Sequence, residues 1–232
     1  MKRSILIIAL LLFSFSSFAQ AKVRFGFTTS PGISWYSADS KFVDSKGTRF
    51  SFNYGAVFDF VIDNNERYAI SSGVTIDMSG GKLSGVSSDN TNPGSSSLTA
   101  KVQYFEIPLS LKLRSNESAN NLTFYGSLGI INSFRIRARG AYSYVDQNFP
   151  EDNFSDNNVR ISNLEFFPSD INKINLYHLA LHFEGGVEFR VSDNTSLVGG
   201  IYFRNGFTNV IKDTDNERVV ARGLGLRIAV MF

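Results

Sequence analysis

The amino-acid sequence predicts an all-β protein, an eight-stranded antiparallel up-and-down barrel that spans a membrane. Three observations support this prediction. Large apolar residues alternate with small or polar residues along eight segments, the connections between the segments are alternately short and long, and an export signal precedes the first segment. Alternation with a period of two is typical of strands with lipid on one side and a packed or hydrated interior on the other.

The alternation is clearest in the last segment. From Val220 to Phe232 the even positions are large and apolar except at Arg222, whereas the odd positions are mostly small or, at Arg227, charged. The other segments repeat the pattern, and together the eight cover residues 23–35, 50–62, 67–79, 99–113, 122–135, 176–191, 195–207 and 218–232. Several exceed the roughly 9–11 residues that a tilted strand needs to cross a bilayer, so we expect some strands to project beyond it.

The connections indicate the orientation of the chain. Short connections rich in turn-forming residues cover 63–66, 115–121 and 192–194. They alternate with long polar stretches at 36–49, 80–98, 136–175 and 208–217. Short periplasmic turns and longer extracellular loops follow each other in this way in outer-membrane barrels. This order predicts that both termini lie on the periplasmic side.

The N-terminus has the features of a secretory signal. Two basic residues, Lys2 and Arg3, precede an apolar run at 5–13, and cleavage is expected after Ala19 or Ala21. The apolar run is shorter than the roughly 20 residues of a membrane-spanning helix, which argues against the alternative of a retained anchor. We therefore expect a signal peptide at 1–20 and a single barrel domain at 21–232.

Composition excludes several other classes of protein. The formal net charge of +2 gives no electrostatic reason to expect nucleic acid as a partner. The chain has no cysteine, so it has no disulfide, no thiol nucleophile and no thiolate metal site. A closed barrel needs no disulfides because closure pairs the backbone of every strand.

A soluble barrel of the lipocalin type is the alternative fold, since it would bury its large apolar residues inside. In this chain the opposite face of each segment is rich in glycine, serine and alanine. Such small residues form a poor water-facing exterior, so the membrane-spanning arrangement explains the pattern better.

Charged residues on the small-residue face are expected to line the interior. An eight-stranded barrel is only wide enough for side chains to fill, so we expect these residues to form a network of hydrogen bonds and ion pairs. A narrow proton or ion path is the alternative. The residues are Asp59, Asp77, Glu106, Lys112, Glu184, Glu188, Arg190 and Arg227.

The same face also carries residue types that metal binding or lipid-modifying catalysis would use. His178, His182 and Glu184 have ligand-type side chains, but their spacing spreads them over about 20 Å at roughly 3.3 Å per residue, so we expect no metal site. Ser133 and His178 are candidates for a lipid-modifying enzyme at the barrel rim, but no spacing enforces that geometry. We therefore expect no catalytic residues and no cofactor.

The long connection 136–175 contains Phe149, Phe154, Phe166 and Phe167 among acidic and amide residues. Loops of this length are usually functional or disordered, so it is a candidate to cover the barrel mouth or to bind a partner. Arginines at its base are candidates to contact lipopolysaccharide phosphates, and an ordinary charged rim is the alternative. These arginines are Arg135, Arg137 and Arg139.

The segment Tyr104-Phe105-Glu106-Ile107-Pro108-Leu109-Ser110-Leu111-Lys112 resembles a strand of the PorT-like small outer-membrane barrels of Bacteroidetes. The Phe-Ala-Gln end of the signal and Gly-Gly-Val-Glu-Phe at 185–189 fit the same family. The resemblance implies a barrel in the cell outer membrane, in contact with lipid and lipopolysaccharide, without a shared set of catalytic residues.

For function, we expect a non-enzymatic protein with a structural, adhesion or protein-secretion accessory role through its extracellular loops. Secretion-system or cell-envelope proteins are then the expected protein partners. The alternative is a component of the type IX secretion system, as the namesake branch of the family suggests. Likeness of fold does not by itself decide between these roles.

Overall fold

The computed structural model describes residues 22–39, 43–86, 94–118, 120–146, 174–210 and 218–232. The strands in this part of the chain are β1 (Val23–Asp39), β2 (Val43–Gly47), β3 (Arg49–Val61), β4 (Tyr68–Val86), β5 (Gly94–Arg114), β6 (Leu122–Asp146), β7 (Tyr177–Ser192), β8 (Thr195–Gly206) and β9 (Arg218–Met231). Within the same residues, no helix is long and apolar enough to cross a membrane. The expected signal peptide at 1–20 and the four phenylalanines between 149 and 167 lie outside the described residues.

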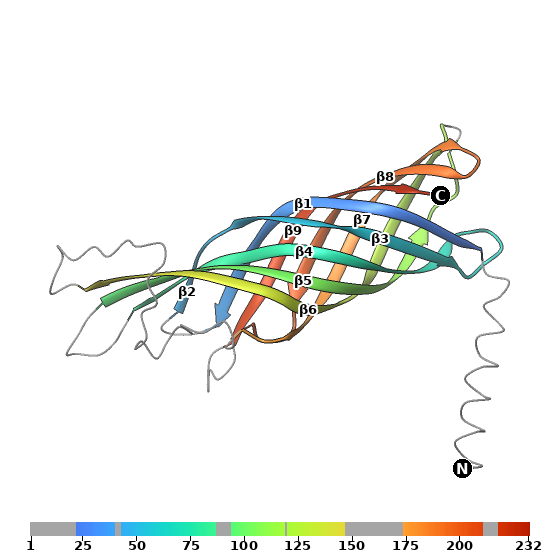
Figure 1. Cartoon of the computed structure of the whole chain (residues 1–232). Coiled ribbons are helices and arrows are strands. Elements are labelled where there is room, and N and C mark those ends of the chain that lie inside the picture. The colour runs from blue at the N-terminus through green and yellow to red at the C-terminus, as the bar shows by residue number, and fades with distance from the viewer. Residues whose placement is uncertain (1–21, 40–42, 87–93, 119, 147–173, 211–217) are drawn as a thin grey trace, which may run out of the picture.

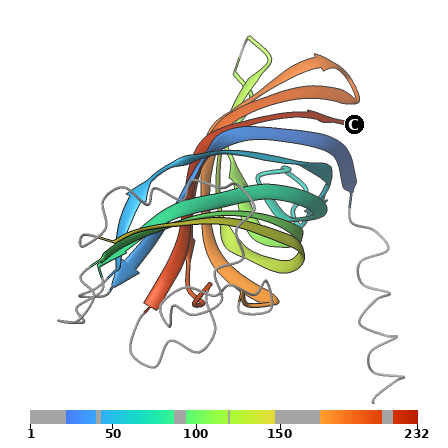
Figure 2. The same ribbon diagram turned by 60° about the vertical axis from the view of Figure 1, so that its left-hand side comes forward.

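Eight of these nine strands close into an antiparallel barrel. The sheet order is β2-β4-β3-β1-β9-β8-β7-β6-β5, and a further pairing of β4 with β5 closes the ring. Apart from the small strand β2, each strand pairs with its neighbours in sequence, and β1 pairs with β9. The predicted eight-stranded up-and-down barrel is confirmed, and Figures 1 and 2 show its strands inclined around a common axis.

Alternation along the strands separates two faces, as the sequence predicts. The outward face carries exposed large apolar side chains on every barrel strand. The inward face carries glycine, serine, threonine, tyrosine and the charged residues. Outward examples from eight strands are Phe27, Phe58, Val74, Leu109, Leu128, Phe183, Ile201 and Leu226. So large an exposed apolar surface is stable only against lipid or a partner.

Aromatic pairs lie near both ends of this apolar surface. Near the termini, the rings of Phe25 and Phe232 have centroids 5.3 Å apart. Near the opposite end, the rings of Phe134 and Tyr177 are 5.4 Å apart. Aromatic side chains gather at the two membrane interfaces of outer-membrane barrels, so these pairs approximate the edges of the apolar band.

Several strands are longer than the sequence predicts. Residues 80–86 and 94–98, expected in a connection, belong to β4 and β5, and residues 136–146 belong to β6. The stretch 36–49 likewise contains the end of β1 and all of β2, which pairs with β4 beyond the last β3 pair. In these residues the backbone still pairs with neighbouring strands. The alternation of large apolar residues stops, because side chains beyond the bilayer no longer face lipid.

The additional strand length forms an extension of the barrel wall. We define the extracellular extension as residues 43–47, 79–86, 94–103 and 136–146. In Figure 1 these parts of β2, β4, β5 and β6 run past the other strands at the end away from the C-terminus. This end carries the longer connections, and is therefore the extracellular end by the loop-length rule.

Candidate functional site

The interior of the barrel is filled by a chain of ion-paired side chains. Seven of the eight predicted interior residues are ion-paired there, six of them buried and Arg227 partly buried: Asp59, Asp77, Glu106, Lys112, Glu184, Glu188 and Arg227. The eighth predicted residue is Arg190. It lies at the periplasmic rim, exposed, where Arg190 Nη2 is 2.6 Å from Glu117 Oε2. Arg190 is close to the end of β7, so its strand leaves the packed interior before this position.

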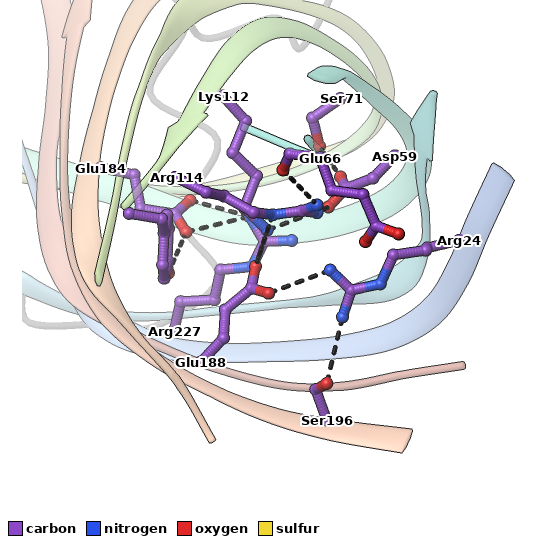
Figure 3. Close-up of polar contacts among 11 residues, drawn as sticks. Arg24, Asp59, Glu66, Ser71, Lys112, Arg114, Glu184, Glu188, Ser196 and Arg227 are labelled. Carbon is purple, nitrogen blue, oxygen red and sulfur yellow. Dashed lines mark hydrogen bonds and ion pairs between the residues drawn. The ribbon is translucent and has the colours of Figure 1, made fainter. Parts of the chain in front are cut away.

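A periplasmic cluster occupies the interior near the termini (Figure 3). Asp59 accepts hydrogen bonds from Ser71 Oγ at 2.7 Å, Lys112 Nζ at 2.9 Å and Arg114 Nη2 at 2.6 Å. Glu188 pairs with Lys112 and Arg114 as well. The two carboxylates therefore share two cations inside the barrel, an arrangement that offsets their loss of hydration.

Arg24 extends the periplasmic cluster toward the mouth. Its Nη1 donates to Glu188 Oε2 at 3.0 Å, and its Nη2 donates to Ser196 Oγ at 3.2 Å. The five charged residues of the cluster come from β1, β3, β5 and β7, so the cluster ties together strands from across the barrel. Each of these residues occupies an inward-facing position of its own strand.

A central cluster surrounds Glu184. Arg227 Nη1 donates to both carboxylate oxygens of Glu184 at 3.1 and 2.8 Å, and Tyr125 Oη donates to Oε1 at 2.6 Å. His182 Nε2 lies 3.1 Å from Glu184 Oε2. Lys112 lies over the Tyr125 ring, 4.6 Å from its centroid, and thereby connects the central cluster to the periplasmic one.

An outer cluster lies between the central cluster and the extracellular end. Arg204 Nη1 is 3.2 Å from Asp77 Oδ1 and 3.1 Å from Glu106 Oε1. Glu106 also accepts hydrogen bonds from Asn53 Nδ2 at 2.8 Å and Ser133 Oγ at 3.0 Å. A cavity of about 40 Å³ borders this cluster, and its polar lining suits bound water.

The outermost layer of the interior is apolar. Tyr36, Leu83, Ala100, Val210 and Val219 form a buried cluster beyond the outer ion pairs. Ile174 packs against it, and the backbone N–H of Asn175 donates to the Val210 carbonyl at 2.8 Å. Ions would therefore meet both paired charges and an apolar layer along the axis.

Glycines on the inward face make room for the tyrosines of these clusters. A Cβ at Gly200 would lie 2.4 Å from Tyr125 Oη, and one at Gly32 or Gly225 would lie 2.6 Å from Tyr202 Oη. Small residues on one strand thus accommodate large ones on another, as close packing of a narrow barrel requires.

Adjacent glycines of β8 give a test of this packing. At Gly199, which points outward, a Cβ would meet nothing within 4 Å, unlike at Gly200. We expect Gly200→Ala to lower the free energy of unfolding by about 1–3 kcal/mol through overpacking, and Gly199→Ala to change it by less than about 0.5 kcal/mol. Urea-induced unfolding from lipid vesicles measures both values. Equal effects would contradict the assigned faces.

The residues considered for catalysis or metal binding have other partners. Ser133 and His178 are opposite each other on β6 and β7. However, Ser133 donates to Glu106, and His178 Nδ1 lies 2.9 Å from Thr208 Oγ1. Both are buried. His178 and His182 therefore do not share a partner, and Ser133 is hydrogen-bonded to a carboxylate instead of an imidazole.

The predicted lipopolysaccharide residues are divided between the two faces. Arg135 is opposite Tyr104, whose side chain points inward, whereas Arg137 and Arg139 are opposite Gln103 and Lys101. A bulge at this point shifts the register. The three arginines therefore do not share one face of the strand, because one additional residue in β6 reverses the alternation.

A polar vestibule opens at the periplasmic mouth. Its volume is about 690 Å³, and its lining includes Arg24, Asn65, Arg114 and Arg190. At its rim, Lys22 Nζ donates to Glu66 Oε1 at 2.6 Å. This hydrogen bond is the main cause that holds the pKa of the Glu66 carboxyl below its usual value. The vestibule is accessible to polar groups from the periplasm.

The predicted network left out three cations of the interior, although the alternation along segments 23–35 and 195–207 places two of them, Arg24 and Arg204, on the inward face. Arg24, Arg114 and Arg204 are ion-paired in the clusters but were not among the predicted network residues. Their spacing along the strand identifies them, because residues two positions apart lie on the same face. Arg114 follows Lys112 by two positions, and Arg204 follows the buried Tyr202 by two. Their ion-pair partners lie on other strands, so spacing along one strand does not predict which carboxylate each cation pairs with.

Comparisons with known proteins agree with this architecture. A family model described as outer membrane protein beta-barrel domain matches residues 18–211. Among solved structures, Neisserial surface protein A is 11% identical, with 91% of this chain and 99% of that chain covered and a TM-score of 0.39. The attachment invasion locus protein Ail of Yersinia pestis is 10% identical, with 91% and 99% covered and a TM-score of 0.35.

OprG from Pseudomonas aeruginosa, an outer membrane protein, is 11% identical, with 90% of this chain and 94% of that chain covered and a TM-score of 0.38. No curated protein was found to be similar in sequence to this chain.

Proposed function

The chain belongs to the outer membrane protein beta-barrel domain family, and from this premise we propose that it is a non-enzymatic, non-conducting barrel that recognises a partner through its extracellular extension. As a member with a closed barrel, it resides in the outer membrane and contacts lipid through its outward face.

The filled interior supports a role other than transport. Paired charges extend from the periplasmic cluster through Glu184 and Arg227 to Arg204. The apolar cluster around Leu83 and Val219 lies beyond them. Moving a solute along the axis would require these buried pairs to separate without compensation, which is costly in a low-dielectric interior.

The extracellular extension is the observation that carries the proposal. β5 has 21 residues and β6 has 25, well above the roughly 9–11 that a tilted strand needs to cross the bilayer. Long-range pairing keeps their ends in register over the full length. A rigid scaffold that presents connecting segments beyond the lipid surface is a common arrangement for recognition.

A shortened variant tests this proposal. Replacing 86–95 with an Asn–Gly turn and 145–173 with a short Gly–Ser linker retains the interior clusters and Leu83, Ala100 and Ile174 of the apolar layer. The Gly85 and Ser96 pair can close a two-residue hairpin. We expect the variant to show a normal mobility shift on boiling, but cells expressing it to lose adhesion to one another and to an immobilised matrix surface.

The alternative role is a PorT-type component of the type IX secretion system. The vestibule of about 690 Å³ favours this alternative, since it offers a periplasmic partner a polar docking site. The proteins secreted by cells carrying the intact chain, the shortened chain or neither would be compared. Loss of secretion in the strain without the chain, with adhesion unchanged in all three strains, would overturn the recognition role in favour of this one.

A further inference from the structure

The outer wall of the extracellular extension carries a row of exposed cations. Lys101 of β5 is directly opposite Arg139 of β6, and Arg137 lies two positions from Arg139 on the same face. Lys82 of β4 is opposite Thr99, which is two positions from Lys101. Side chains that are opposite or diagonal on one face of a sheet lie within about 8 Å of each other. The four cations therefore form one continuous surface.

The bulge in β6 creates this surface. Tyr104 is paired with Arg135 and Gln103 with Arg137, so Ile136 is the additional residue. Phe134 and Ile136 are both exposed on the outward side, and Arg137 follows on that side as well. Without the additional residue, Arg137 and Arg139 would lie on the same face of β6 as Arg135 and point toward the interior. A bulge that redirects side chains often serves a functional purpose.

These cations differ from the other charged residues of the barrel wall. The interior cations Arg24, Lys112, Arg114, Arg204 and Arg227 all pair with carboxylates. In the described part of the chain, no ion pair involves any cation of the row. Like charges opposite each other on neighbouring strands are destabilising, so an external anion would relieve the repulsion between Lys101 and Arg139.

The position of the row relative to the apolar band identifies the anion. On the same face of β5, Ile107, Leu109, Leu111 and Leu113 are exposed apolar residues. Lys101 lies six positions beyond Ile107, about 20 Å along the strand before its tilt is considered. On β6, Arg137 comes three positions after Phe134, which belongs to the outer aromatic pair. This is the level of the lipid headgroups of the outer leaflet.

We propose that Lys82, Lys101, Arg137 and Arg139 bind the phosphate groups of a phosphorylated glycolipid headgroup in the outer leaflet, the lipid A part of lipopolysaccharide. Guanidinium groups bind phosphate through two parallel hydrogen bonds, and the lysines add compact positive charges. The two arginines approach the phosphates from one strand and the lysines from the neighbouring strands. This proposal does not depend on the recognition role of the extension.

The test measures lipid binding to the folded, full-length mature chain in zwitterionic detergent micelles. Bisphosphorylated lipid A and enzymatically dephosphorylated lipid A are titrated, and bound lipid is quantified by native mass spectrometry. Lys101→Gln combined with Arg139→Gln is expected to weaken binding of the phosphorylated lipid by about tenfold or more. Binding of the dephosphorylated lipid should not change.

The matched control is Lys22→Gln combined with Arg67→Gln, which removes two exposed cations at the periplasmic end. It should bind both lipids as the unchanged chain does. Equal weakening in the control, or equal affinity of the unchanged chain for both lipids, would overturn the proposal. Complete displacement of lipid A by millimolar inorganic phosphate would also overturn it, since the site would then be one for free phosphate.

A charge-preserving variant separates binding from folding. Lys101→Arg combined with Arg139→Lys retains both positive charges, and we expect it to keep binding within about threefold of the unchanged chain. The mobility shift on boiling verifies that each variant is folded. Loss of lipid binding in this folded variant would show that positive charge at these positions is not the determinant, and the proposal would fail.

Discussion

Replacing Glu184 with glutamine is expected to lower the free energy of unfolding by about 3–5 kcal/mol. Glu184 is the carboxylate paired with Arg227, at 2.8 Å, and it also accepts the Tyr125 hydroxyl. Its neutralisation leaves a guanidinium in the interior without the anion that offsets its loss of hydration. Breaking one side of a buried pair costs more than the pair itself contributes.

The measurement is urea-induced unfolding from lipid vesicles, followed by the fluorescence of the single tryptophan, Trp35. Glu117→Gln, which breaks an exposed pair with Arg190 at the rim, is the control and should cost less than about 1 kcal/mol. Glu184→Gln combined with Arg227→Gln should recover part of the loss, because no uncompensated charge is left. A cost below 1 kcal/mol for Glu184→Gln would show that water or another group solvates Arg227.

Leu109→Arg is expected to destabilise the barrel in a bilayer by about 2–4 kcal/mol. Leu109 is 48% exposed on the outward face of β5, between Ile107 and Leu111, in the middle of the apolar band. A guanidinium there must lie in hydrocarbon or distort the bilayer to reach water.

Gln103→Arg is the matched control, because Gln103 lies on the same face of β5 beyond the band. It should cost no more than about 1 kcal/mol, as charged residues near the interface do. The same unfolding measurement applies to both variants. Similar costs at the two positions would mean that the apolar band is shifted along the strand.

The closed barrel and the faces of its strands follow from residues near in sequence. Alternation along β5, with Leu109 and Leu111 outward and Glu106 and Lys112 inward, is visible without any knowledge of neighbouring strands. A strand has only two faces, and the size of the side chains on each face indicates which one contacts lipid. Seven of the predicted residues lie in the ion-paired interior, and Arg190 lies at the rim, where the strand leaves the packed region.

The ends of the long strands could not be predicted in this way. Beyond the lipid the strands β4, β5 and β6 carry few large apolar residues, and the sequence between 94 and 100 has only Leu98, too few for an alternation to be visible. Those residues are strand because Leu98 pairs with Leu83 and Tyr142 on both sides. Hydrogen bonding between distant segments maintains the extension there.

The bulge at Ile136 is a further feature that alternation along one strand misses. Read as a simple strand, β6 would place Arg135, Arg137 and Arg139 on one face. The pairing with β5 adds one residue and separates them. Local propensity does not specify a bulge, because its cost and its benefit both depend on the partner strand.

Periodicity and connection lengths in the chain predict an exported eight-stranded barrel with an apolar outside and a charged inside. Which charges pair, as Glu184 with Arg227 and Asp59 with Lys112, is visible only when the strands are placed side by side. The two kinds of property differ in the separation along the chain of the residues that they involve. Periodicity is a property of neighbours in the chain, whereas an ion pair and a bulge are relations between strands brought together by closure of the barrel.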